Sequence, residues 1–161
     1  MRLIGLLNKI VIYFFLTSSN LVGNDAFTYV YLLPFDNIQN DSSIDWISVG
    51  LIDMAKQELK DKYGIRLKDK NDLEIVMNDR SLMLKQPIGS RNILILGKYN
   101  RQLDRINVNM QAVDVATWEE LGKSQISESY TKIPALNRAV GRSISEMLQP
   151  FLPCLLYTSD A

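Results

Sequence analysis

Hydrophobic positions change their spacing along the chain, and each spacing predicts a different kind of element. Residues 27–35 form a short apolar run, rich in aromatic and β-branched side chains, that ends at Pro34. Such a run is typical of a buried strand. From Ser43 to Lys62, apolar residues recur every three or four positions, which predicts an amphipathic helix. Gly64 follows directly and would end this helix in the left-handed conformation.

Two further elements complete the first half of the chain. Ile65 to Lys68 can supply a short strand. Residues 72–79 fit a helix better than a strand, because their apolar side chains are spaced at i, i+3 and i+4. Two sequences match a capping box, in which a side chain at each end of the first helical turn bonds to the backbone. They are Ser42-x-x-Asp45 before the first helix and Asn71-x-x-Glu74 before the second.

The second half of the chain changes to a period of two. Residues 93–99 form another buried strand, and residues 106–112 alternate strictly between apolar and polar, which predicts a strand with one wet face. The alternation breaks at Val113 and Val115, which indicates a β-bulge or a stretch that is buried on both faces. After a turn at Glu119 to Gly122, a third strand is expected at about 123–132. A final amphipathic helix lies between Pro134 and Pro150.

The predicted order is therefore β-α-β-α-β-β-β-α. A chain of 161 residues has room for one domain with a real core. Helices that pack on one face of a mixed sheet would bury all of these apolar stripes. The sequence thus predicts an α/β domain over residues 25–153, with a single mixed sheet of about five strands and helices mainly on one face.

The first 24 residues have the three parts of a secretory signal. Arg2 and Lys9 give a positive start, residues 10–16 are wholly apolar, and residues 17–20 are polar. The apolar part is shorter than the ~20 residues that span a membrane. Because no clean small-x-small cleavage triplet follows, we expect residues 1–24 to be either a signal peptide or an uncleaved N-terminal anchor. A buried core helix is the further alternative.

The last eight residues look foreign to the domain. Residues 154–161, Cys-Leu-Leu-Tyr-Thr-Ser-Asp-Ala, resemble the translation of a transposase adapter used in preparing sequencing libraries. We expect this segment to be a translation artefact and the domain to be truncated near Pro153. A genuine apolar C-terminus is the alternative.

Charge and composition exclude several functions. Eighteen basic and eighteen acidic side chains cancel, so no overall field attracts nucleic acid or anionic lipid. Histidine is absent, which excludes Ser-His-Asp and Cys-His catalysis and argues against ordinary zinc sites. No phosphate-cradling glycine pattern occurs. We therefore expect no catalytic residue, no cofactor and no metal, and a protein that is not an enzyme.

Two tryptophans are the candidate contact residues, since aromatic side chains dominate interface hot spots. Trp46 lies beside the apolar stripe of the first predicted helix, so it can belong partly to the core. Trp118 lies in a predicted turn, where core packing does not readily explain a large aromatic ring. Two acidic clusters have plainer interpretations as turn formers and as the wet face of a helix. They are Asp36, Asn37 and Asp41, and Asp53, Glu58 and Asp61.

From about Tyr29 to Leu152, the order of elements and four short motifs resemble the envelope family of FlgO and TolB amino-terminal-like domains. CsgG-type domains are more distant relatives. The motifs are Val30–Asn37, Asp45-Trp46 through Gly50-Leu51, Ile93–Tyr99 and Val113-Asp114-x-x-Thr117. Trp118 stands where the family usually has glycine. We therefore expect the turn to avoid a positive φ at that position or to place it elsewhere.

The resemblance implies an exported, non-catalytic interaction domain of a bacterial envelope, flagellar or secretion-associated assembly. Its partners would be envelope proteins, not nucleic acid, and it would reach the membrane only through an uncleaved leader. The alternative is the N-terminal accessory domain of a truncated larger sensor, enzyme or repeat-containing protein.

Overall fold

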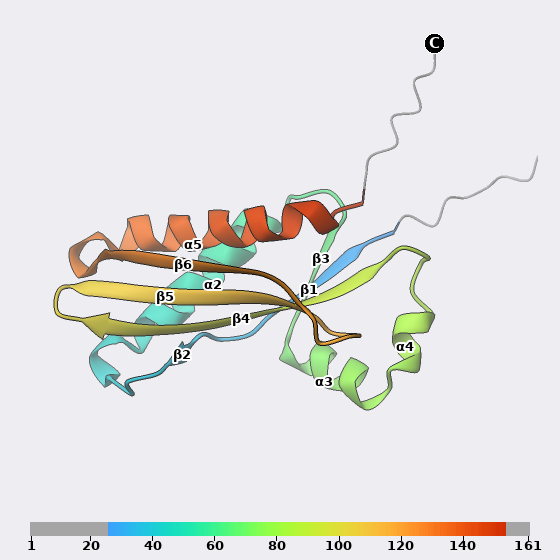
Figure 1. Cartoon of the computed structure of the whole chain (residues 1–161), viewed down its shortest axis with the longest axis horizontal. Coiled ribbons are helices and arrows are strands. Elements are labelled where there is room, and N and C mark those ends of the chain that lie inside the picture. Colours follow the sequence, from blue (N-terminus) through green and yellow to red (C-terminus); the bar gives the residue numbers. More distant parts are fainter. Residues whose placement is uncertain (1–25, 154–161) are drawn as a thin grey trace, which may run out of the picture.

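The computed structural model describes residues 26–153 (Figure 1). The predicted leader (residues 1–24) and the predicted artefact (residues 154–161) lie outside this range. The elements are β1 (Thr28–Leu32), β2 (Asp36–Asn37), α2 (Trp46–Leu59), β3 (Ile65–Lys68), α3 (Lys70–Asn78), α4 (Ser81–Leu84), β4 (Arg91–Gln102), β5 (Arg105–Asp114), β6 (Glu120–Ser129) and α5 (Ile133–Leu148).

One mixed sheet of six strands organises the described residues. Its order is β3-β1-β4-β5-β6, and the short β2 pairs with β4. Strands β1 and β3 are parallel, β1 and β2 both run parallel to β4, and β4, β5 and β6 form an antiparallel meander. The predicted single mixed sheet is confirmed. The sixth strand arises because the chain leaves the sheet at Pro34, which has no N–H to donate, and rejoins β4 at Asp36.

Helices α2 and α5 cover one face of the sheet and enclose the main core (Figure 1). The two helices run in the same direction and approach closely through two glycines. A Cβ atom at Gly50 would lie 3.0 Å from the side-chain amide of Asn137, and one at Gly141 would lie 3.3 Å from the carbonyl oxygen of Met54. Small residues at both contacts let the backbones come together, so the helix pair forms one compact layer.

Within residues 26–153, the opposite face is covered only at one end of the sheet. There α3 and α4 enclose a smaller apolar cluster of Tyr31, Leu73, Val76, Leu94 and Val115 (Figure 1). Over the rest of β4, β5 and β6 this face carries the polar side chains of the predicted alternation, such as Asn107, Asn109 and Gln111. The predicted β-bulge is confirmed by a register shift between Ala112 and Val113.

Both predicted capping boxes are wrong in their residues. Ser42 lies inside the short 3-10 turn before α2 and is not its N-cap, and the Asp45 carboxylate accepts from the side-chain amide of Asn37. Asp41 caps the short 3-10 turn before α2 by accepting from the Ser43 N–H. Helix α3 begins at Lys70, earlier than predicted, and this start places the box on Asp69 and Asp72.

Candidate interaction surface

Trp118 lies in the turn between β5 and β6, with its backbone in the left-handed region. Its φ is +62° and its side chain is 49% exposed. The turn is held by Asp114, whose carboxylate accepts the N–H groups of Ala116 at 2.8 Å and Thr117 at 3.1 Å. The Asp114 carbonyl accepts the Trp118 N–H at 2.8 Å. These bonds fix the loop and hold a bulky residue in a backbone conformation that favours glycine.

Two expectations for this turn are corrected. The turn does not avoid a positive φ at Trp118, because the bonds to Asp114 over-determine the loop. A left-handed conformation costs a residue with a Cβ atom roughly 1–2 kcal/mol. The predicted turn at Glu119 to Gly122 is also misplaced, since β6 already begins at Glu120. A strained backbone that carries an exposed aromatic ring is a reason to look for a function there.

Substitutions at Trp118 should reveal this strain directly. Trp118→Gly and Trp118→Ala both remove the indole ring, but only glycine relieves the left-handed backbone. We expect the glycine variant to be more stable than the alanine variant by about 1 kcal/mol, the reverse of the usual order in strands. Urea unfolding of the two variants measures the difference. An alanine variant as stable as the glycine variant would show that the turn is unstrained.

Other exposed apolar side chains lie at the same end of the molecule as Trp118 (Figure 1). The Arg80 guanidinium donates to the Ala116 carbonyl at 3.5 Å, so the α3–α4 connection lies against this turn. Ile75 on α3, Leu84 on α4 and Ile88 in the next loop are 56%, 87% and 98% exposed. These elements and the β5–β6 turn share one end of the molecule (Figure 1), which we call the α3–α4 end.

Trp46 lies at the other end of the sheet. It is 54% exposed, and its indole N–H donates to the Ser43 carbonyl at 3.0 Å. Tyr99 ties this region to β4, since its hydroxyl donates to the Ile44 carbonyl at 3.3 Å. Strand β5 separates the two ends, and its ten residues span roughly 30 Å. The structure therefore does not bring Trp46 and Trp118 into one contact surface.

The two acidic clusters lie where their plainer interpretations placed them. Hydrogen bonds from the hydroxyl and N–H of Ser43 lower the pKa of Asp41, as expected of a capping carboxylate. Asp53, Glu58 and Asp61 are exposed, and Glu58 lies 3.6 Å from Lys62 in an i,i+4 pair. Within residues 26–153, no group of three or more acidic, Cys or His side chains is arranged to hold a metal ion.

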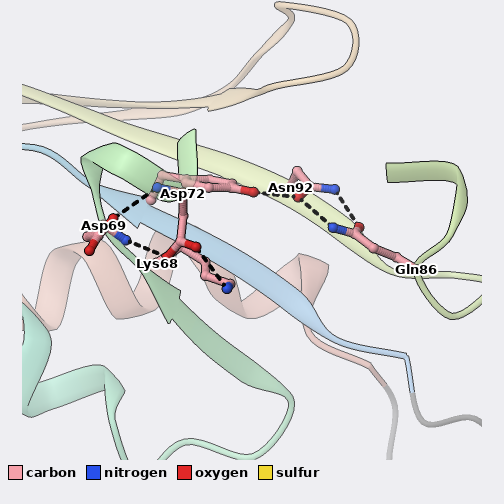
Figure 2. A network of polar contacts seen from close by, with 6 residues as sticks. Lys68, Asp69, Asp72, Gln86 and Asn92 are labelled. Atoms are coloured by element: carbon pink, nitrogen blue, oxygen red, sulfur yellow. Dashed lines mark hydrogen bonds and ion pairs between the residues drawn. The ribbon is translucent and has the colours of Figure 1, made fainter. Parts of the chain in front are cut away.

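A polar network lies beneath the α3–α4 end (Figure 2). The side-chain amides of Gln86 and Asn92 bond to each other at 2.8 and 3.2 Å, and Lys68 pairs with Asp72 at 3.2 Å. The Tyr31 hydroxyl donates to Asn92 at 3.0 Å. Burial, with a smaller contribution from the charge of Asp72, raises the pKa of Tyr31 to about 12. The network fastens the loop before β4 to the sheet.

Tyr31→Phe should make stability less sensitive to alkaline pH. A tyrosine has a pKa of about 10 when unfolded. The neutral Tyr31 therefore stabilises the fold fully below pH 10, and this contribution is lost as the pH rises toward its folded pKa of about 12. Between these values, the unsubstituted protein should lose up to about 1.4 kcal/mol per pH unit more than the variant. Urea unfolding at a series of pH values measures how the free energy of unfolding of each protein changes with pH. Equal slopes would show that the pKa of Tyr31 is not raised in the folded protein.

The uncovered part of the sheet contains a hollow of about 530 Å³. Its lining carries four charged side chains, two of each sign, among amides. They are Asp36, Lys98, Glu120 and Lys123, with Asn109, Gln111 and Gln125 between them. The period-two pattern predicted a wet face here, but such a pattern cannot show that the face is hollowed. Asn92 was also missed, although a polar residue at the start of an apolar strand was a visible signal.

The described residues thus form a mixed-sheet α/β domain with exposed tryptophans at opposite ends. None of its helices is long and apolar enough to cross a membrane. No model of a protein family matches the sequence, and no curated protein matches it significantly.

Among solved structures, TolB from Acinetobacter baumannii is similar over 82% of this chain, with 17% identity and a TM-score of 0.53. The match covers 30% of the TolB chain, so this chain spans less than a third of that protein's length. At this identity the likeness shows a shared fold and nothing more. The TolB part of the predicted resemblance is supported at the level of fold, whereas the FlgO and CsgG parts remain predictions.

Two further bacterial structures match with TM-scores below 0.5. Lipoprotein GNA1162 from Neisseria meningitidis has 15% identity and a TM-score of 0.44, and the match covers 73% of this chain and 96% of that one. The C-terminal domain of LpoB from Escherichia coli has 14% identity and a TM-score of 0.44, with 69% and 91% coverage. Neither likeness is close enough to support an argument about function.

Proposed function

We propose that this chain is an exported, non-catalytic interaction domain of a bacterial envelope that binds a protein partner through Trp118. The observation that carries the proposal is the strained, half-exposed indole in the β5–β6 turn. Large aromatic side chains on rigid supports make favourable contacts because little conformational entropy is lost on binding. The exposed apolar side chains of the α3–α4 end would surround this anchor.

A site-specific cross-link tests the contact. A photoreactive residue at Thr117, beside Trp118, should form a covalent product with a partner in the bacterium that makes the protein. The same residue at Lys60, the exposed residue that follows α2, is the control. Trp118→Gly should abolish the product while the domain stays folded. A product that persists in this variant, or that forms equally from position 60, would refute Trp118 as the anchor.

The compartment is tested separately, because it depends on residues 1–24. These residues, with their positive start and apolar centre, are expected to carry a fused reporter enzyme out of the cytoplasm. The control is the same fusion with residues 10–16 interrupted by two aspartates, which removes the apolar centre. A reporter that stays in the cytoplasm with the unaltered leader would count against export.

A second candidate is an accessory domain of a larger sensor, enzyme or repeat-containing protein. The comparison with TolB favours it, since the matching part there is 30% of a longer chain. The intact gene discriminates between the two candidates. A stop codon soon after the codon for Pro153 would support the first, and a further catalytic or repeat domain would support the second.

A further inference from the structure

A groove runs between α5 and β6, away from both tryptophans. It has a volume of about 480 Å³ and is lined by Ile126 on β6 and by Ala135, Arg138, Ala139, Arg142, Ser143 and Glu146 on α5. The α5 residues recur at helical spacing, so they form one stripe beside the strand. Ser143 fastens the helix to the sheet through its hydroxyl, which lies 2.6 Å from that of Ser124. The groove is therefore a fixed feature of this layer.

The groove lies along an open edge of the sheet. Strand β6 is last in the strand order and pairs only with β5 among the described residues. Its other side offers backbone donors and acceptors over the length of Glu120–Ser129. Such an edge is a template for an added strand unless it is blocked. The short side chains of Ala135 and Ala139 leave room beside it for another backbone.

The charge along the groove selects the added strand. Arg138 and Arg142 are exposed and are separated by four positions on α5, a spacing at which like charges repel. Within residues 26–153, neither guanidinium has an ion pair or a hydrogen bond. Glu146 also lines the groove, but it is one carboxylate against two guanidinium groups. An occupant with carboxylates on its helix-facing side would relieve this repulsion and form charge-assisted contacts.

We propose that this groove binds an extended, acidic segment of a partner protein, which adds to β6 as a further strand. Side chains of a strand alternate between faces, so every second residue of the segment would face α5. Backbone bonds to β6 would give affinity, and carboxylates opposite Arg138 and Arg142 would give selectivity. This surface is separate from Trp118, so the inference does not depend on the function proposed above.

Synthetic ten-residue peptides of alternating valine and glutamate test the proposal with the full chain. Binding is measured by fluorescence anisotropy at low salt, and a peptide of alternating valine and glutamine is the neutral control. The double variant Arg138→Gln/Arg142→Gln should weaken binding of the acidic peptide about tenfold or more, which corresponds to about 1.4 kcal/mol. Lys56→Gln/Lys60→Gln is the matched control, since it removes two exposed charges at the same spacing from the C-terminal end of α2 and should change binding less than twofold.

Two further measurements separate strand addition from simple charge attraction. Peptides methylated on alternate backbone nitrogens lose the donors of one edge only. One of the two methylation patterns should therefore bind and the other should not. Charge reversal by Arg138→Glu/Arg142→Glu should move the preference to a peptide of alternating valine and lysine. Trp118→Gly should leave all of these affinities unchanged.

Several outcomes would overturn the inference. No saturable binding of the acidic peptide, or equal affinity after loss of both arginines, would show that the groove does not select acidic segments. Equal binding of both methylated peptides would show that no strand is added. A second copy of the chain is the other possible occupant, and sedimentation equilibrium tests it. A dimer that dissociates when Arg138 and Arg142 are replaced would assign the groove to that second copy.

Discussion

Leu51→Ala is expected to lower the free energy of unfolding by about 2–5 kcal/mol. The side chain is fully buried at the middle of α2, where this helix packs on the sheet and against α5. Truncation removes its transfer free energy and leaves a cavity that the closely packed helix pair cannot collapse around. Urea unfolding at neutral pH measures the loss as a shift of the midpoint at a constant slope.

Lys56→Ala is the matched control on the same helix. Lys56 is exposed, and a substitution at such a position changes stability by no more than about ±0.5 kcal/mol. Similar midpoints for the two variants would mean that α2 does not pack on the sheet as described. A large loss in both would point to a helix that is needed as a whole, independent of its buried face.

Gly97→Ala should be nearly as damaging, by the opposite mechanism. A Cβ atom at Gly97 would lie within 2.5 Å of three ring atoms of Phe35, which is itself only 3% exposed. The ring is enclosed and cannot move aside, so the added methyl group must displace β4 or the segment after Pro34. Overpacking of this kind typically costs about 1–3 kcal/mol, and we expect a loss near the upper end of that range.

Gly122→Ala is the control for that clash. Gly122 lies in β6, and an added Cβ atom would meet only Met147, at an ordinary contact distance of 3.8 Å. Alanine at a compatible strand position stabilises by about 0.4–1 kcal/mol through the unfolded chain. The two glycine variants should therefore shift the unfolding midpoint in opposite directions. A tolerated Gly97→Ala would show that Phe35 is not seated against β4.

The periodic parts of the sequence predicted the fold well. The stripes of α2 and α5 and the alternation of β5 each reflect burial on one side of an element, and burial is what a hydrophobic pattern encodes. Start sites were less predictable, because several Asp, Asn and Ser residues near α2 and α3 compete for one capping position. The structure chose Asp41 and Asp69 over Ser42 and Asn71.

Trp118 marks the clearest limit of that reasoning. The resemblance and the backbone preference of tryptophan both predicted that Trp118 would avoid the left-handed conformation. The hydrogen bonds that Asp114 accepts stabilise that conformation instead, and residue spacing does not predict their geometry. The sequence shows an acidic residue, Asp114, next to a predicted turn, but it does not show how strongly that residue would hold the turn. The groove beside β6 was equally hidden, since it depends on where α5 lies relative to a strand edge.

The contact between the two ends of the domain has a consequence for how the chain acquires its structure. The Thr28 hydroxyl donates to the Phe151 carbonyl at 2.6 Å, and buried side chains of α2 and α5 belong to the same core cluster. Helices distant in the chain must therefore meet before either has a stable environment, so loop closure is the entropic barrier. During synthesis, a chain that has left the ribosome only as far as β6 lacks α5, and therefore lacks part of the main core. Folding is then expected to be all-or-none and to begin only after α5 has emerged.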